Sequence, residues 1–321
     1  MLLKLVPDDT NIPFTKWRFA ALIFSASLIL ASLGALATLG LNFGIDFRGG
    51  VTIEVGAEQA VNIGEVRSTV QALNLGNVKV QEIQDVTGGG KGVMVFIEQQ
   101  DTDANDEHAR ELAQQAASEK VQQALRGLLG ENIEFRKIDV VGPTVSGELI
   151  QRGALAVGLA VLMMLGYIWL RFEWQFGLGA ILALVHDVTI TMGVFAVTRL
   201  EFNLPIIAAV LTIVGYSVND TVVVYDRIRE DLRKYKKKPL PELIDLAINS
   251  TLSRTVMTSG TTLMTLIALY LLGGAVLRGF TFAMIFGIVI GTYSSIFVAA
   301  PILLMTGVKR DWSKQPATAA P

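Results

Sequence analysis

The sequence predicts a polytopic α-helical membrane protein with a small α+β domain between its first two membrane helices. Of the 321 residues, 51% are hydrophobic and 17% are charged, and the mean hydropathy is +0.49. That composition is too apolar for an ordinary soluble domain. The apolar residues also gather in six long runs, and runs of about 20 residues have the length needed to cross a bilayer as a helix.

Each apolar run predicts one membrane helix, and together they cover residues 19–41, 148–170, 176–197, 204–225, 255–272 and 280–306. The first run follows Lys16 and Arg18 and contains Ala35-Leu36-Ala37, so it also has features of a signal peptide. Its length favours a membrane helix, because the apolar core of a signal peptide has only about 7 to 15 residues.

Lysine and arginine predict the orientation, because they are enriched in cytoplasmic loops. With the N-terminus inside, the cluster from Arg227 to Lys238 and most other basic residues near the membrane lie in the cytoplasm. Only Arg199 and Arg278 then fall in short outer loops. The predicted cytoplasmic parts are residues 1–18, the amphipathic and basic loop 226–253 and the tail 307–321, whereas 42–147 lie outside.

The segment 42–147 predicts a folded α+β domain. It has 16 acidic and 9 basic residues, a net charge of −7, whereas the rest of the chain carries +5. Strand patterns at 51–55, 77–86, 91–98 and 133–141 and helical patterns at 63–73 and 106–129 give the order β-α-β-β-α-β. This order is typical of ferredoxin-like domains, and Gly88-Gly89-Gly90 is interpreted as the turn between the two central strands.

Several classes of function find no support in the sequence. Cysteine is absent, and the two histidines do not form a metal-binding motif, so we expect no metal and no cofactor. No hydrolase or transferase constellation is present, and we do not expect an enzyme. In the basic segment 227–238 acidic residues are interleaved, which favours lipid headgroups over nucleic acid as its partner. Residues 240–252 are expected to lie amphipathically along the inner membrane face.

One carboxylate stands inside a predicted membrane helix. Asp220 lies in the fourth run, and a charge at mid-bilayer costs about 2.5–3.5 kcal/mol on insertion scales. Such a residue faces the protein interior, finds a partner or takes up a proton, so the default hypothesis is an ion or proton site. Around it the fourth run supplies Thr212, Tyr216, Ser217 and Asn219, and the fifth run supplies Arg254, Thr258, Ser259, Thr261, Thr262 and Thr265.

These polar residues predict a proton-coupling site. Because the fourth and fifth helices run antiparallel, Arg254 can reach towards Asp220 along its long side chain. We hypothesise that the proton affinity of Asp220 changes as Arg254 approaches and leaves, and that hydroxyls of Ser217, Thr258, Ser259, Thr261 and Thr262 hold the waters of the path. Two simpler roles stay open, Asp220 as a structural partner of Arg254 and Arg254 as an interfacial positive-inside residue.

Two further features of the membrane helices have more than one interpretation. His186 and Asp187 lie near the middle of the third run, where they form either a satisfied polar helix contact or a second station of a proton relay. Gly287 and Gly291 form a GxxxG pattern in the sixth run. Such small residues allow two helices to approach closely, and we interpret this pair as a contact with a partner subunit.

Motifs along nearly the whole chain resemble the SecF family, part of the SecD/SecF family of the bacterial protein translocase and of the RND-like superfamily. The SecD branch is similar but looks larger in its external region. The segments that carry the resemblance are Gly44-Ile45-Asp46-Phe47-Arg48-Gly49-Gly50, Val141-Gly142-Pro143-Thr144, His186-Asp187-Val188, Gly215-Tyr216-Ser217-Val218-Asn219-Asp220-Thr221, Tyr225-Asp226-Arg227 and Ser253-Arg254-Thr255.

The resemblance implies a function in protein export. A SecF-like chain would lie in the bacterial inner membrane with a periplasmic domain at 42–147. It would act with SecD and the SecYEG channel, and with YajC and YidC, on unfolded polypeptides in translocation. In such a chain Asp220 and Arg254 would couple the proton-motive force to movement of the external domain. The competing hypotheses are a fragment of an RND-type small-molecule efflux transporter and a passive scaffold. Whether the coupling ion is H⁺ or Na⁺ is left open.

Overall fold

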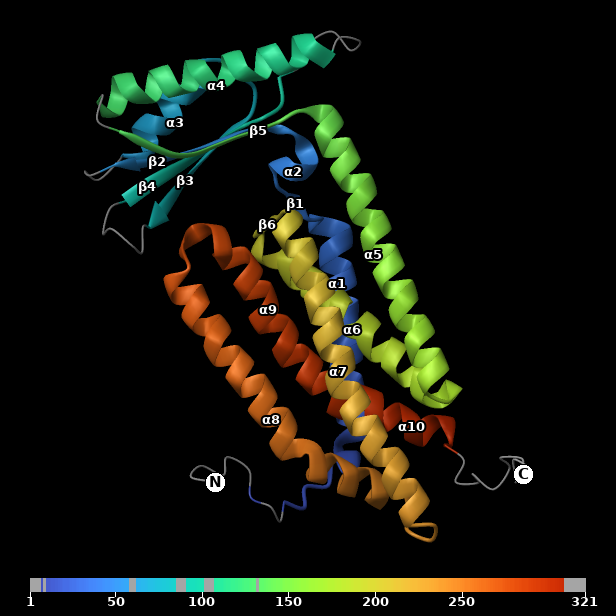
Figure 1. Cartoon of the computed structure of the whole chain (residues 1–321). Coiled ribbons are helices and arrows are strands. Elements are labelled where there is room, and N and C mark those ends of the chain that lie inside the picture. The colour runs from blue at the N-terminus through green and yellow to red at the C-terminus, as the bar shows by residue number, and fades with distance from the viewer. Residues whose placement is uncertain are drawn as a thin grey trace, which may run out of the picture.

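The chain forms a bundle of membrane-length helices with an α+β domain seated on one end (Figure 1). The structure, a computed structural model, describes residues 7, 10–57, 62–84, 91–100, 107–130 and 133–308. Six helices in these residues are long and apolar enough to cross a membrane. The predicted fold class, six membrane helices with a small α+β domain after the first, is confirmed.

The membrane helices are longer than the apolar runs that predicted them. A 3₁₀ turn, η1 (Phe14–Trp17), leads into α1 (Arg18–Leu39), and the later spans are α5 (Pro143–Arg171), α6 (Trp174–Thr198), α7 (Leu204–Lys234), α8 (Leu240–Leu272) and α9 (Gly274–Ser294). The last span continues through a π-helical turn, η2 (Ser295–Ala299), into α10 (Ala300–Thr306). Prolines near the starts of α5, α7 and α8 suit the first turn, where a helix has no use for their missing N–H.

Residues 240–252 do not lie against lipid as predicted. They are the first turns of α8, which begins beside the end of α7 and then runs along α9 (Figure 1). Their apolar side chains, Leu243, Ile244, Ala247 and Ile248, are buried in the bundle core. Their polar side is held by the N-terminal segment, because Asp245 accepts hydrogen bonds from the amide and hydroxyl of Thr15, each at 2.8 Å. The protein itself therefore covers this segment.

The α+β domain has the predicted element order. Its elements are β2 (Gly50–Ala57), α3 (Ile63–Gln71), β3 (Val78–Gln84), β4 (Lys91–Ile97), α4 (Glu107–Leu129) and β5 (Glu134–Val141). The antiparallel sheet has the order β3-β4-β2-β5, and both helices cover one face (Figure 1). Alternate residues of β2, such as Val51 and Ile53, pack under Val121 and Leu125 of α4. The glycine turn 88–90 lies outside the described residues.

A short unpredicted element joins the domain to the bundle. β1 (Asn42–Phe43) pairs in parallel with β6 (Glu201–Phe202), and the helical turn α2 (Ile45–Arg48) follows β1 directly. The rings of Phe43, Phe47 and Phe202 lie 5.8–5.9 Å apart. The Asp46 carboxylate accepts a hydrogen bond at 2.9 Å from the amide of Leu204, the first residue of α7. The start of β2 and the start of α7 are therefore held together.

The GxxxG pair serves a contact inside the chain, not the partner contact that we predicted. A Cβ atom added to Gly287 would lie 2.4 Å from side-chain atoms of Ile213, and one added to Gly291 would lie 3.1 Å from the Cβ of Ser217. Both neighbours belong to α7. The missing side chains thus let α9 approach α7 closely, and this approach positions the polar groups described next.

Candidate functional site in the membrane bundle

Asp220 is held by hydroxyl groups, not by arginine. Its side chain is buried between α7, α8 and η2, where Thr255 Oγ1 donates to Oδ1 at 2.8 Å and Ser295 Oγ donates to Oδ2 at 2.5 Å. Within the described residues no ion pair links Asp220 to Arg254, and Arg254 is exposed. In this conformation Arg254 therefore lies away from the Asp220 carboxylate, and the predicted approach of the two residues stays a prediction. Successive residues of a helix point about 100° apart, so Thr255 occupies the face towards Asp220 and Arg254 does not.

Arg254 instead lines a polar crevice next to the site. The cavity has a volume of about 420 Å³ and is lined by the C-terminal part of α7 and the N-terminal part of α8. These parts lie at the end of the bundle opposite the α+β domain (Figure 1). Its α7 residues follow Asp220 along one helix face, and Thr251 precedes Thr255 by one turn of α8. The crevice therefore approaches within one helical turn of Asp220. Its lining residues are Val223, Asp226, Arg227, Glu230, Ser250, Thr251 and Arg254.

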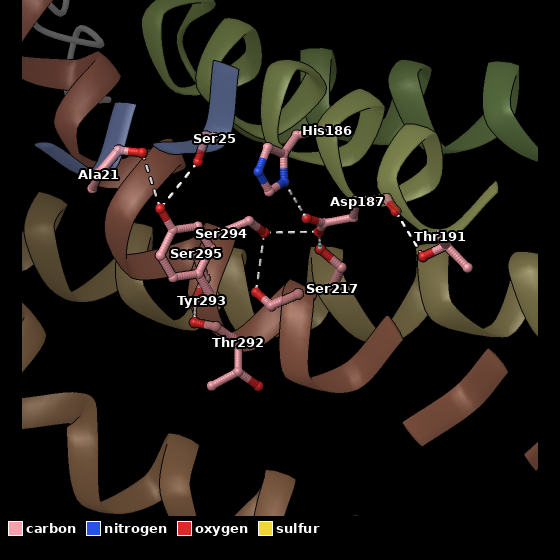
Figure 2. A network of polar contacts seen from close by, with 11 residues as sticks. Ala21, Ser25, His186, Asp187, Thr191, Ser217, Thr292, Tyr293, Ser294 and Ser295 are labelled. Carbon is pink, nitrogen blue, oxygen red and sulfur yellow. Dashed lines mark hydrogen bonds and ion pairs between the residues drawn. The ribbon is translucent and has the colours of Figure 1, made fainter. Parts of the chain in front are cut away.

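A second carboxylate, that of Asp187, collects three hydrogen bonds in the interior (Figure 2). His186 Nδ1 lies 2.8 Å from Oδ1, and Oδ2 accepts from Ser217 Oγ at 2.5 Å and from Ser294 Oγ at 2.7 Å. Asp187 is 0% exposed and His186 is 1% exposed. Every bond of this carboxylate is thus made by protein groups of α6, α7 and α9.

The imidazole of His186 sits between the carboxylate and the first helix. Its ring stacks on that of Tyr293 with centroids 6.1 Å apart. The Tyr293 hydroxyl donates to the carbonyl oxygen of Ala21 at 3.0 Å and lies 3.1 Å from Ser25 Oγ (Figure 2). His186 Nε2 is buried and has no hydrogen-bond partner in the described part of the chain. With the Asp187 carboxylate ionised, Nδ1 must carry the proton that it donates to Oδ1, and Nε2 is the ring nitrogen that is left without a partner.

Two consecutive serines connect the two carboxylates. Ser294 ends α9 and bonds to Asp187, whereas Ser295 begins the π-helical turn η2 and bonds to Asp220. Single π turns are rare and frequently occur at functional sites. The predicted site residues did not include Ser294, Ser295, Thr255, Thr292 or Tyr293. The available signal was the serine pair inside an otherwise apolar membrane run.

Most of the predicted threonine stripe does not reach the site. The hydroxyls of Thr258, Thr261 and Thr262 donate to carbonyl oxygens of their own helix, as threonines in membrane helices commonly do. Asn219 is exposed on the outer face of the bundle, as are Thr258 and Thr261. Ser217 and Ser259 do lie inside the bundle.

Tyr216 makes only a weak connection to the site. Its hydroxyl lies 3.5 Å from Ser259 Oγ, which in turn lies 2.8 Å from Thr292 Oγ1.

Together, the buried groups are two carboxylates, an imidazole and several hydroxyls. Carboxylates and imidazoles bind and release protons, and hydroxyls relay them. In the described ranges no group of three histidine or acidic side chains is placed to hold a metal ion.

Two family models match the chain. The model described as "Protein export membrane protein SecD/SecF, C-terminal" matches residues 120–309, and "SecD/SecF GG Motif" matches 34–61. The second match includes Gly49 and Gly50, which follow α2. The first model covers α5 to α10, and the second covers the end of α1 and the link to the α+β domain.

Curated relatives named "Protein translocase subunit SecF" match along their full length. The protein from Ketogulonicigenium vulgare is 48% identical over 98% of this chain and 95% of its own. That from Vibrio alginolyticus is 40% identical over 98% and 96%, and that from Rickettsia rickettsii is 43% identical over 98% and 97%.

Solved structures of SecDF match the fold. The crystal structure of SecDF from Thermus thermophilus, a translocon-associated membrane protein, superposes with a TM-score of 0.78 at 34% identity over 93% of this chain. SecDF in a form called Super-membrane-facing superposes with a TM-score of 0.64 at 34% identity over 95%. In both cases the match spans only 39% of the longer SecDF chain.

Proposed function

The chain belongs to the SecD/SecF family of protein-export membrane proteins as a translocase subunit of SecF type, and we propose that it couples a proton gradient to polypeptide export. The resemblance that the ordered motifs predicted is confirmed, and the chain is a transport subunit, not an enzyme. Proton coupling, the orientation in the inner membrane and the absence of a cofactor stay proposals.

One observation carries the proposal: a polar crevice that Arg254 lines reaches, at Val223 and Thr251, within about one helical turn of the buried Asp220. A proton that enters the crevice comes within one helical turn of the carboxylate. Arg254 lies one residue before Thr255, which already bonds to Asp220. A rotation of α8 by up to about 100°, part of which the long Arg254 side chain can span by itself, would replace the hydroxyl by the guanidinium. An adjacent positive charge favours release of a proton from a carboxyl group.

The interior beyond Asp220 offers a continuation of the path. Ser295 and its neighbour Ser294 link Asp220 to Asp187, and Asp187 bonds to His186. Hydroxyl groups both donate and accept hydrogen bonds, so they can pass a proton when a water completes the gap. We therefore assign His186 and Asp187 to the second station of the relay.

Mechanical coupling would run through α7, the helix that carries Asp220. Its first amide is bonded to Asp46, which lies shortly before the glycine pair at the start of β2. A shift of α7 would therefore pull directly on the sheet of the α+β domain. The two SecDF structures superpose on this chain with different TM-scores, 0.78 and 0.64. This difference supports a family fold that moves.

The partners follow from the outer face of the bundle and from the names of the relatives. The amide side chain of Asn219 faces outward from a helix that crosses the membrane, and an amide without a hydrogen-bond partner is costly against lipid. In the solved relatives a single chain carries the SecD and SecF names together. We propose that SecD membrane helices cover this face, and that the assembly acts with SecYEG, and with YajC and YidC, on unfolded polypeptides.

The test measures export driven by a proton gradient in inverted membrane vesicles that contain SecD, SecYEG and variants of this chain. Asp220→Asn should assemble with SecD but abolish the gradient-dependent part of export. Glu148→Gln is the matched control, because this carboxylate on α5 is exposed and, among the residues that the structure describes, forms its ion pair only with Arg152. Unchanged export by the Asp220→Asn variant would refute the coupling proposal and favour a passive scaffold.

The same vesicles distinguish H⁺ from Na⁺ coupling and polypeptide export from small-molecule efflux. Collapse of the proton gradient by a protonophore should stop the Asp220-dependent export, whereas a sodium ionophore should not. The opposite result would assign the coupling to Na⁺. An efflux function would be favoured by one result: the vesicles take up small apolar dyes only when Asp220 is intact, whereas polypeptide export is the same with and without Asp220.

A further inference from the structure

A deep apolar groove separates α5 from the rest of the bundle near the α+β domain. It encloses about 610 Å³, within the range of about 300–1,000 Å³ that is usual for small-molecule sites. Helices α5, α6 and α7 form its walls, and β1 and α2 form its upper end. Among the lining residues are Ala154, Val157, Met192, Ile207 and Val210.

The groove has the height of one leaflet of a bilayer. Along α5 its lining runs from Ile150 to Gly158, a rise of about 12 Å at 1.5 Å per residue. Half of a bilayer's hydrocarbon core measures about 15 Å. On α7 the lining residues lie in the first two turns, and on α6 they lie near the middle and beyond. The groove therefore spans the leaflet that is next to the α+β domain.

A single cation stands at the mouth of this apolar space. Arg48, the last residue of α2, lines the groove and is exposed. In the part of the chain that the structure describes, its side chain makes no hydrogen bond or ion pair. An apolar cleft of acyl-chain depth below a free guanidinium is complementary to a lipid with an anionic head group, because arginine binds phosphate oxygens in pairs.

Glycine keeps the groove open. A Cβ atom added to Gly158 would meet no atom within 4 Å, so the space beside this residue is vacant of protein. The neighbouring turns of α5 make few contacts with the bundle, and Leu155 and Leu159 are exposed. A flexible acyl chain fits beside such a surface and would fill the gap between α5 and α7.

From this geometry we propose that the groove is a binding site for one anionic phospholipid, with an acyl chain along α5 and the phosphate on Arg48. The bound lipid joins α5 to α6 and α7 and seats α2 above them. The site lies on the opposite side of α7 from the polar crevice and does not depend on proton coupling. Its failure would leave the coupling proposal untouched.

The experiment asks whether a phospholipid stays with the purified protein. The full chain, with SecD where the two co-purify, is reconstituted in vesicles of equal phosphatidylglycerol and phosphatidylethanolamine, extracted in mild detergent and examined by native mass spectrometry. The unaltered chain should retain one phospholipid, with about a five-fold preference for phosphatidylglycerol, the bias expected from one cation near a head group.

Two substitutions test the two halves of the site. Gly158→Phe should fill the groove and remove the retained lipid, whereas Gly166→Phe should not. Gly166 lies on the same helix, is also exposed and also has open space around it, but it does not line the groove. Arg48→Gln should keep the lipid but reduce the preference for phosphatidylglycerol to near parity.

Three outcomes would overturn the proposal. They are equal retention by the unaltered chain and by Gly158→Phe, an unchanged head-group preference in Arg48→Gln, and loss of the lipid from the unaltered chain whenever SecD is bound. The last result would make the groove a contact between subunits. Thermal unfolding of each variant shows whether a lost lipid reflects a lost fold.

Discussion

Removal of Asp187 should cost the bundle more stability than removal of Asp220, because only Asp187 holds an imidazole. The two substitutions to alanine delete the same atoms from buried sites on neighbouring helices, so their cavity costs are similar. They differ in which hydrogen-bond donors they leave without an acceptor. Asp187→Ala frees His186, Ser217 and Ser294, whereas Asp220→Ala frees Thr255 and Ser295.

The freed hydroxyl groups can turn to their own helices. Ser294 Oγ already lies 3.1 Å from the carbonyl oxygen of Gly291, and Ser295 Oγ lies 3.0 Å from that of Thr292. A serine or threonine inside a helix can generally use the carbonyl oxygen one turn earlier. His186 has no such choice. Its Nδ1 would lose the Asp187 carboxylate, and its Nε2 is already without a partner among the described residues.

The expected difference is therefore the cost of one orphaned buried polar group, about 1–3 kcal/mol. In a chain of this size that corresponds to a Tm lower by about 2–10 °C for Asp187→Ala than for Asp220→Ala. The assay is thermal unfolding in detergent micelles at pH 7, followed by intrinsic fluorescence and by retention of monodisperse protein.

A double variant makes the reasoning refutable. If the imidazole is the source of the difference, His186→Leu added to Asp187→Ala should restore part of the lost stability, because removal of both partners costs less than removal of one. Additive losses, or equal Tm values for the two single variants, would show that the orphaned imidazole is not the cause. The same variants also report on function: a relay station should lose export even where the fold survives.

Three further variants test other parts of the structure by thermal unfolding. Burial, opposed by Lys79 and reinforced by Asp46, raises the pKa of Glu201 in the folded protein, so its share of stability is complete below the unfolded pKa and is lost as pH rises through the folded pKa. Glu201→Gln should flatten this loss of stability as pH rises above 4.5, and an unaltered profile would contradict the burial. Gly287→Ala should lower the free energy of unfolding by about 1–3 kcal/mol through overpacking. Gly215 has open space around it, so Gly215→Ala should raise the free energy of unfolding by up to about 1 kcal/mol. A change of the same sign in both variants would be evidence against the close helix contact. Asp46→Ala should cost about 0.5–2 kcal/mol as a lost helix cap, and no loss would mean that this bond does not secure α7.

The fold was predictable where a local pattern decides it. Apolar runs of membrane length fixed the six spans, and alternation of side chains along strands such as 51–55 fixed the sheet. The joint between the two parts was not predictable. β1 and β6 have two residues each, too few for a period, and their pairing joins segments about 160 residues apart. Only the tertiary structure brings them together.

The candidate site was predictable in its carboxylates but not in their partners. Asp220 stands out because an unpaired charge in an apolar run is costly. Which side chain meets it depends on the rotation of α8 about its axis. The sequence analysis named Arg254, whereas its neighbour Thr255 makes the contact. The threonine stripe was misleading for a physical reason: a threonine hydroxyl can satisfy itself on its own helix, so its presence does not show which way the face points.

The choice of hydroxyl groups in place of a fixed arginine bears on whether Asp220 can change its charge. A buried carboxylate locked to a guanidinium stays ionised, because protonation would leave the arginine as an uncompensated charge. Serine and threonine tolerate both states, since each hydroxyl donates to the ionised group, accepts from the protonated group or returns to a backbone carbonyl. Asp220 accepts hydrogen bonds from two such groups, and Arg254 lines the adjacent crevice. An exposed Arg254 is therefore no argument against proton coupling. It is the arrangement that a site needs if the cation is to arrive and leave during a cycle.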